Sequence, residues 1–283
     1  MSYLDLLLHD GFAVFERLLP SRDWFDDLYR ITDVLMDSLS DEAAAEWRQS
    51  ALDWLSEEDN GSYFCGAPPA YRDRAGAEGK RNKAYIQWCL DYARSRQYAK
   101  TRVASMAHAR ELTAKLELLH AICSETYVNV LADFEADYPE FVGRYDPERP
   151  LPILFKLVRY NRSPRRFATD PHFDKSGFSI ILRADDEKVQ WRLGKGNPCR
   201  ISTMTAPIEY PADSADPNPA ILFSGLCLEA VGVKVPPTPH FVLPVEQKKY
   251  RHSIIAFLLV PHVDTDNLVT DAPYIQDALM AVA

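Results

Sequence analysis

The residues best suited to chemistry are His172 and Asp174, which are separated by a single residue, and His240, which comes much later in the chain. In a strand or an extended turn, side chains two positions apart project to the same side, so His172 and Asp174 offer two ligand atoms on one face. An imidazole from a distant strand can complete the set. Two imidazoles and one carboxylate, with the opposite side left open, are the ligands of non-heme Fe(II) centres. We therefore predict a metal site at these three residues.

A second same-face pair, Arg251 and Ser253, follows His240. A guanidinium fork beside a hydroxyl group is a good receptor for a carboxylate. The intervening His252 is expected on the opposite face of the strand, with a packing or surface role. The second half of the chain therefore offers both a metal site and an acid-binding site.

The segments around these residues resemble the isopenicillin N synthase-like branch of the iron- and 2-oxoglutarate-dependent oxygenases. That family carries His-x-Asp, a Gly-Asp-x-Leu-Glu segment, Thr-x-His-Arg-Val, and Arg-x-Ser in a strand that ends in proline. The counterparts in this chain are His172–Asp174, Gly225–Glu229, Thr238–Val242 and Arg251–Ser253. The resemblance runs from Leu154 to Pro261, and upstream Gly11–Phe15 is similar to the family's N-terminal strand.

The chain departs from the family pattern at positions that are not ligands. Leu226 stands where the family has the aspartate after glycine, and Phe241 stands where it has the arginine after the second histidine. The interval between Asp174 and His240 is longer than the family's. We assign the extra residues to Tyr210–Pro219, which has the proline, aspartate and asparagine content of a turn-rich insertion.

The resemblance implies Fe(II), 2-oxoglutarate as co-substrate, and O2. The C1 carboxylate and keto oxygen of 2-oxoglutarate would take two metal positions, and its C5 carboxylate would pair with Arg251 and Ser253. Tyr160 matches a family tyrosine that hydrogen-bonds this C5 carboxylate, whereas Val158 replaces an asparagine. Decarboxylation to succinate and CO2 would accompany hydroxylation, desaturation or cyclisation of a small molecule such as an amino acid, a peptide or a natural-product intermediate. Because Asp174 is a carboxylate, we expect oxidation and not halogenation.

In that family, N-terminal helices and strands facing the iron line the substrate pocket. The basic segment Lys80–Tyr85, in an otherwise acidic protein, is either a carboxylate-binding element or a solvated helix start. The candidate pocket residues are Tyr63, Phe64, Arg81, Lys83, Tyr85, Gln87, Lys156, Arg183 and Trp191.

Two other functions fit the same residues. One is an oxidase of this fold that uses Fe(II) and O2 without 2-oxoglutarate, since isopenicillin N synthase and aminocyclopropanecarboxylate oxidase also retain Arg-x-Ser. The other is a non-catalytic β-sandwich module that binds a metal or an anion. The sequence has neither a Gly-x-Ser-x-Gly nucleophile elbow nor a glycine-rich phosphate loop. Those motifs would have indicated hydrolase or nucleotide chemistry.

Composition limits the remaining possibilities. The 283 residues, 47% of them hydrophobic, suffice for one sizeable core. The net charge of −9 argues against a nucleic-acid partner. No apolar stretch is long enough for a membrane span, and an early Asp5 argues against a signal peptide. Five dispersed cysteines predict reduced thiols and a cytoplasmic location, and oligomeric state is not predicted.

Helical patterns dominate the first half and strand patterns the second. A short strand is expected at Gly11–Leu19, and helices are expected at Ser21–Leu39, Asn82–Arg96 and within Gln97–Glu135. Strands are expected at Ile153–Tyr160, Phe178–Arg183, Lys188–Leu193, Ala220–Phe223, Phe241–Leu243 and Ser253–Val260. The predicted class is α+β, with a double-stranded β-helix (jelly-roll) core and N-terminal helices packed on one face. We expect one oxygenase domain over 1–283, with a mainly helical region at 1–150, the core at 151–265 and a tail at 266–283.

Overall fold

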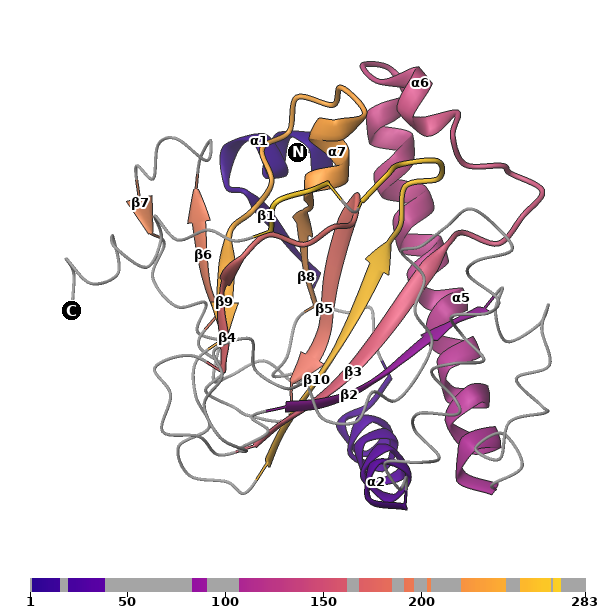
Figure 1. The fold of residues 1–283 in the computed structure, drawn as a ribbon. Helices are drawn as coiled ribbons and strands as arrows, with labels where there is room; N and C mark the ends of the chain where they lie inside the picture. The colour runs from indigo at the N-terminus through magenta and orange to yellow at the C-terminus, as the bar shows by residue number, and fades with distance from the viewer. Residues whose placement is uncertain are drawn as a thin grey trace.

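The protein is built from two antiparallel sheets with helices beside them (Figure 1). The computed structural model describes residues 2–15, 20–38, 83–90, 107–161, 168–184, 191–195, 203–204, 220–242, 250–265 and 267–270. The helices are α1 (Tyr3–His9), α2 (Arg22–Ser38), α5 (Ala107–Glu135), α6 (Pro139–Val142) and α7 (Leu226–Ala230). No helix within these ranges is both long and apolar enough to cross a membrane.

The strands divide into a large sheet and a small sheet. The large sheet has six strands in the order β1 (Phe12–Phe15), β8 (Ala220–Ser224), β5 (Phe178–Ala184), β10 (Tyr250–Leu258), β3 (Ile153–Asn161) and β2 (Lys83–Cys89). The small sheet has four strands in the order β4 (Thr169–His172), β9 (His240–Val242), β6 (Trp191–Lys195) and β7 (Thr203–Met204). The N-terminal strands β1 and β2 thus close the two edges of a sheet whose centre comes from the second half of the chain.

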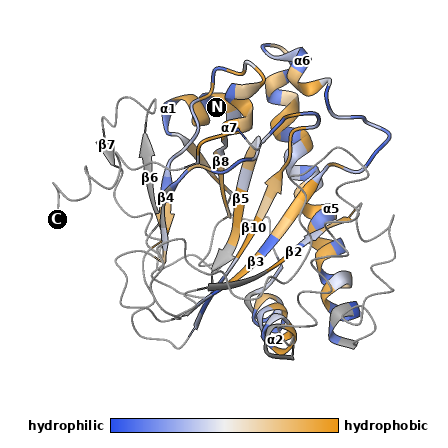
Figure 2. Ribbon diagram, viewed as in Figure 1, coloured by the Kyte–Doolittle hydropathy of each residue, from blue (hydrophilic) through white to orange (hydrophobic). Residues whose placement is uncertain are grey.

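Helices α2 and α5 lie beside the large sheet, and Figure 2 shows that its central strands β5, β10 and β3 are largely hydrophobic. The long helix α5 lies against one face of this sheet, and its Tyr127 hydroxyl donates a 2.7 Å hydrogen bond to the carbonyl oxygen of Ala256 in β10. Helix α2 is joined to α5 by the 2.8 Å ion pair between Asp27 and Lys115. Each helix turns an apolar stripe inward, as a period of 3.6 residues requires. The buried stripe residues include Phe25, Leu28, Ile31, Leu35, Leu112, Leu116 and Leu119.

Alternation along the strands separates two buried layers. In β10, Ile254, Ala256 and Leu258 are fully buried in the core on the helix side. A second buried cluster has residues from both sheets: Val158, Tyr160, Ala168, Ile181, Ile221, Phe223 and Val242. We call this second cluster the inter-sheet layer. Because neighbouring residues of a strand point to opposite faces, the odd-numbered positions of β10 belong with the inter-sheet layer.

Most predicted elements are confirmed, but one is wrong. The segment predicted as a helix over Asn82–Arg96 contains β2, which pairs antiparallel with β3 along its whole length. Within β2, Ile86 and Trp88 are buried whereas Gln87 is only partly buried, which is the period-two pattern of a strand. Pairing with the edge strand β3 outweighs local helix propensity here. Residues 91–96, 97–106 and 16–19 lie outside the described residues, as do 40–75 and the expected insertion at Tyr210–Pro219.

Candidate active site

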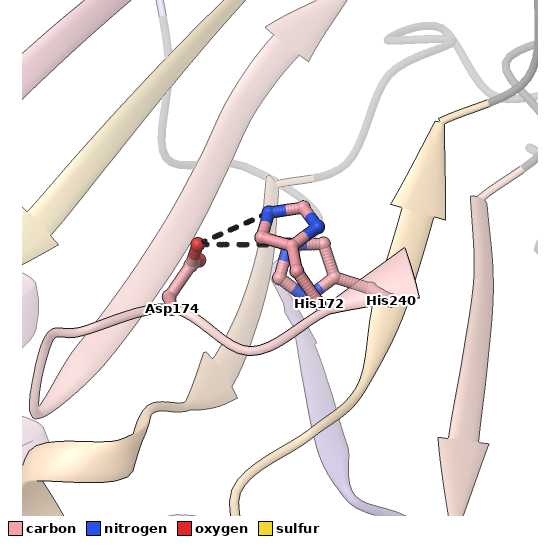
Figure 3. A group of neighbouring side chains, drawn as sticks. All are labelled: His172, Asp174 and His240. Atoms are coloured by element: carbon pink, nitrogen blue, oxygen red, sulfur yellow. Dashed lines mark ion pairs between the residues drawn. The ribbon is translucent and has the colours of Figure 1, made fainter. Parts of the chain in front are cut away.

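Three side chains with metal-binding chemistry meet between the two sheets: His172, Asp174 and His240 (Figure 3). Their potential ligand atoms all lie within 4.8 Å of one another. One carboxylate oxygen of Asp174 is 3.6 Å from Nε2 of His172 and 3.7 Å from Nε2 of His240. The structure therefore brings together the three residues whose spacing predicted a metal site.

Strand pairing places the two histidines side by side. His172 ends β4 and His240 begins β9, and the two residues are direct partners across this antiparallel pair. Their ring centroids are 4.3 Å apart. The His240 side chain is only 5% exposed and packs against Phe223 of β8, at a centroid distance of 4.7 Å. The His172 side chain is 26% exposed, so the site is open on the side of this residue.

The backbone of Thr238 selects the tautomer of His240. Nδ1 of His240 lies 3.2 Å from the carbonyl oxygen of Thr238, and a carbonyl can only accept. Nδ1 therefore carries the proton and Nε2 presents its lone pair toward Asp174 and His172, as metal ligation requires. Thr238 is itself held on both sides, because its N–H donates to the carbonyl of Ser224 at 3.0 Å and its hydroxyl donates to the carbonyl of Gly11 at 2.7 Å.

The carboxylate of Asp174 is oriented by a serine that the sequence analysis did not identify. Ser179 of β5 is fully buried, and its hydroxyl donates to Oδ2 of Asp174 at 2.7 Å while Oδ1 faces the histidines. Ser179 is also hydrogen-bonded to the Ser176 hydroxyl at 2.8 Å. No motif signals this role, because a serine in a strand is ordinary and its partner is known only once β5 is placed.

The loop that carries Asp174 packs closely against the N-terminus of α7. The N–H of Leu226 donates to the carbonyl of Asp174 at 2.8 Å, and the N–H of Gly225 donates to the carbonyl of Gly177 at 2.8 Å. A Cβ atom on Gly225 would collide with the carbonyl oxygen of Ser176. Glycine at this position is thus required by the close approach of two backbones, which gives a structural reason for the glycine of the Gly-x-x-Leu-Glu segment.

Residues that follow β10 accept hydrogen bonds from the other side of the same loop. The N–H of Phe173 donates to the carbonyl of Thr270 at 2.9 Å, and Nζ of Lys175 donates to the carbonyl of Thr265. Residues immediately before and after Asp174 are therefore tied to a segment almost a hundred positions away. These bonds restrain the Asp174 backbone independently of its side chain.

Arg251, Ser253 and Tyr160 lie together at the edge of the inter-sheet layer. Arg251 and Ser253 of β10 are paired in register with Tyr160 and Val158 of β3. The Arg251 guanidinium carbon is 4.8 Å from the centre of the Tyr160 ring, and all three residues are buried. The Ser253 hydroxyl has no hydrogen-bond partner among the described residues, so this enclosed polar atom fits a ligand that brings an acceptor. A carboxylate beside a buried guanidinium supplies that chemistry.

Two titratable groups of the inter-sheet layer are perturbed by burial. Burial raises the pKa of Tyr160, and Arg251 and a hydrogen bond with Thr169 partly oppose this effect. Tyr160 therefore stays a neutral phenol that can donate. Burial lowers the pKa of Lys156, and the charge of the Asp174 carboxylate partly opposes this effect.

The predicted substrate residues are only partly accounted for. Gln87 and Lys156 are partly buried and are register partners on β2 and β3. Tyr63, Phe64 and Arg81 lie outside the described residues. For Lys83, Tyr85, Arg183 and Trp191, the structure describes the strand positions but not the side chains.

Solved structures with this architecture were found, although no family model matches the sequence and no curated protein matches it. A full-length Neurospora crassa protein solved in complex with alpha-KG has a TM-score of 0.61 at 12% identity, covering 99% of this chain and 89% of that one. The dioxygenase for auxin oxidation from rice has a TM-score of 0.58 at 16% identity, covering 98% and 88%. A 2OG-Fe(II) oxygenase family protein from Caulobacter crescentus has a TM-score of 0.61 at 16% identity, covering 96% and 90%. The likeness extends over most of the length of these proteins, and this chain has the fold of the Fe(II)- and 2-oxoglutarate-dependent oxygenases.

Proposed function

We propose that this protein is a non-heme Fe(II)- and 2-oxoglutarate-dependent oxygenase that hydroxylates, desaturates or cyclises a small molecule. The observation that carries the proposal is the pairing of two sites in one layer. His172, Asp174 and His240 offer three ligands at one point, and Arg251, Ser253 and Tyr160 offer a buried carboxylate receptor nearby. A metal ion alone would need only the three ligand residues. A diacid that chelates the metal with one end also needs a receptor for the carboxylate at its other end.

The strand order supports a jelly-roll core for this function. From β3 to β10 the chain places eight strands in two sheets, β8-β5-β10-β3 and β4-β9-β6-β7. The chain changes sheet at nearly every step, which is the winding of a double-stranded β-helix. We assign the core at 151–265 to this architecture, within one domain over 1–283. The order of the motifs along the chain favours the isopenicillin N synthase-like branch.

Each residue has a defined task in this proposal. His172, Asp174 and His240 hold Fe(II), with Ser179 orienting the carboxylate and Thr238 fixing the His240 tautomer. Arg251 and Ser253 bind the C5 carboxylate of 2-oxoglutarate, and the neutral Tyr160 donates a third hydrogen bond. When bound, the iron supplies O2 activation coupled to decarboxylation of 2-oxoglutarate. The apolar side chains of the inter-sheet layer exclude water from that chemistry.

The likeness to proteins with small ligands supports a small-molecule substrate. The Neurospora crassa protein was solved with alpha-KG and thymine, and also with alpha-KG and 5-formyluracil. Three cysteines of the described residues, Cys89, Cys123 and Cys227, are free and buried, and burial raises the pKa of the Cys227 thiol to about 11. Unreactive reduced thiols support the proposal of a cytoplasmic location.

Anaerobic titration tests the function directly. Fe(II) is added to the protein and then 2-oxoglutarate, and the visible charge-transfer absorption of the chelate is followed. We expect a band that saturates at one equivalent of each, and no band with His240→Ala. Iron binding without a 2-oxoglutarate band would favour the oxidase without 2-oxoglutarate. Absence of iron binding would favour a binding module and refute the proposal.

A further inference from the structure

A cluster of charged side chains on the helix side of the large sheet has no task in the proposed function. Its centre is Asp33 of α2, a helix that lies beside the end of the sheet where β10 begins (Figure 1). Oδ1 of Asp33 accepts a 2.8 Å hydrogen bond from Nε2 of His252 and a 3.1 Å hydrogen bond from the guanidinium of Arg159. His252 of β10 and Arg159 of β3 are direct register partners. We call these three residues the helix-side clamp, because one carboxylate oxygen joins two neighbouring strands to a helix.

Two aromatic rings extend the contacts of the clamp. Tyr29 of α2 stacks on the His252 ring at a centroid distance of 5.0 Å. The Arg159 guanidinium carbon lies 4.5 Å from the centre of the Tyr250 ring. Tyr250 and His252 are the two sequence neighbours of Arg251. The clamp and its rings therefore contact the chain on both sides of Arg251.

Arg251 lies near the beginning of β10, where the sheet holds the strand less firmly than at its centre. In the described residues, the ladder between β10 and β5 runs from Leu258 to Ser253 and is irregular between Ile254 and Ile255. Arg251 lies two residues beyond the end of this ladder, where β3 continues as the neighbouring strand. The ends of secondary-structure elements fray more readily than their centres. The position of Arg251 therefore depends in part on the contacts that its sequence neighbours make.

The opposite face of the same two strands carries the carboxylate receptor. Arg251 and Tyr160 are register partners and lie directly beside the pair of His252 and Arg159. Because strand side chains alternate, the clamp faces α2 and the receptor faces the inter-sheet layer. A guanidinium binds a carboxylate best through two parallel hydrogen bonds, and such a site has to be held to within about 0.5 Å. The clamp holds the backbone from which Arg251 projects.

We propose that Asp33 is a positioning residue for the co-substrate: through the clamp it holds the beginning of β10 against β3 and thereby fixes Arg251 to receive the C5 carboxylate of 2-oxoglutarate. The inference rests on the proposed function. Asp33 lies on the helix side of the sheet, whereas the metal residues lie between the two sheets. Its effect is therefore specific to the C5 end of 2-oxoglutarate and does not extend to the metal or to the chelating end.

The experiment compares two 2-oxo acids that differ only at C5. 2-Oxopentanoate has a methyl group where 2-oxoglutarate has its second carboxylate, so it can chelate the metal but cannot pair with Arg251. Calorimetry first gives the dissociation constant of Mn(II), and then those of both acids on the protein loaded with Mn(II). A general loosening of the structure would weaken both acids, whereas a displaced Arg251 weakens only 2-oxoglutarate.

The variants cut the same bond from its two ends. Asp33→Ala removes the acceptor, and His252→Phe removes the donor but retains a ring that can stack on Tyr29. The double variant completes a thermodynamic cycle. Asp27→Ala is the matched control, because Asp27 lies on the same helix but pairs with Lys115 of α5 at 2.8 Å.

We expect Asp33→Ala to raise the dissociation constant of 2-oxoglutarate about 3- to 30-fold, and to leave those of Mn(II) and 2-oxopentanoate within about twofold of the wild type. His252→Phe should give the same pattern. The double variant should bind 2-oxoglutarate no more weakly than the more affected single variant, because both substitutions act through one bond. Asp27→Ala should leave all three constants within about twofold.

Unchanged binding of 2-oxoglutarate in Asp33→Ala overturns the inference, and so does equal weakening of the two acids. Additive effects in the double variant also overturn it, as does an Asp27→Ala variant that weakens 2-oxoglutarate, because any loosening of α2 would then suffice. If Asp33→Ala does not fold, His252→Phe decides by the same criteria. A wild type that binds no Mn(II), or that binds 2-oxoglutarate no better than 2-oxopentanoate, shows failure of the proposed function itself, and this is seen before any variant is compared.

Discussion

Replacement of Ser179 by alanine isolates the contribution of carboxylate orientation to metal binding. The Ser179 hydroxyl is fully buried and donates to Oδ2 of Asp174 at 2.7 Å, so Oδ1 is turned toward both histidines. The substitution removes one hydroxyl group and none of the three ligands. Any loss of metal affinity therefore measures the hydrogen bond and not the ligand set.

The magnitude follows from the nature of this bond. Its acceptor is a carboxylate, and a buried hydrogen bond to a charged group contributes about 1.5–3 kcal/mol. At about 1.4 kcal/mol for each factor of ten, the dissociation constant for the metal should rise about 10- to 100-fold. The free energy of unfolding of the metal-free protein should fall less, by about 1 kcal/mol, because Asp174 is partly exposed and can recruit water.

Calorimetric titration with Mn(II), together with urea unfolding of the metal-free protein, measures both quantities. Ser176→Ala is the matched control, because the Ser176 hydroxyl is equally buried and contacts Ser179 rather than the carboxylate. We expect this control to change metal affinity by less than about threefold. Equal affinities for Ser179→Ala and the wild type would refute the reasoning, since Asp174 would then be oriented by its backbone restraints alone.

Four further outcomes are expected. His240→Ala should remove most Fe(II) affinity with little loss of folding, as judged by calorimetry and circular dichroism. Arg251→Lys should raise the apparent KM for 2-oxoglutarate in a succinate-release assay. Arg251→Ala should weaken the binding of 2-oxoglutarate by about 2–5 kcal/mol and leave the Fe(II) affinity unchanged. Gly225→Ala should lower the free energy of unfolding in urea by about 1–3 kcal/mol, because its Cβ meets the Ser176 carbonyl. Burial raises the pKa of Asp33, but the hydrogen bonds and charges of His252 and Arg159 outweigh burial and hold this pKa below its ordinary value. The stabilisation from the Asp33 carboxylate is therefore lost as pH falls below about 4. Asp33→Asn should flatten this pH dependence of the free energy of unfolding in an acid-unfolding experiment.

The three candidate metal ligands could be picked out from the sequence because their chemistry is local. His172 and Asp174 form a same-face pair within three residues, and Arg251 and Ser253 form another. Side chains two positions apart lie on the same face of any extended segment. Only the contact of these pairs with His240 therefore depended on the fold. The strand pairing His172↔His240 supplies that contact. The periodic elements around them, β3, β5, β8 and β10, were predicted to within a few residues for the same reason.

The remaining features depend on contacts between distant segments. Ser179 acquires its role from the placement of β5 beside the Asp174 loop, and Phe173 is restrained by Thr270 through a bond that no local pattern encodes. The error at β2 has the same origin. The segment contains the helix-forming residues Lys83, Ala84 and Gln87, but it also contains Tyr85, Ile86 and Trp88, which favour a strand. The edge of β3 offers it a partner. Tertiary context decided the structure of that segment.

The two faces of β10 connect the site to the helices. His252, expected in a packing or surface role, is buried, and it donates from Nε2 to Asp33 of α2 at 2.8 Å and stacks on Tyr29 at 5.0 Å. Arg159 on the neighbouring strand reaches the same carboxylate at 3.1 Å. Because strand side chains alternate, this contact on the helix side fixes the register in which Arg251 and Ser253 face the opposite way. A slip by one residue would direct His252 toward the inter-sheet layer, and it would direct Arg251 and Ser253 toward α2. The ion pair on the helix side therefore constrains which groups the inter-sheet layer can present to a ligand.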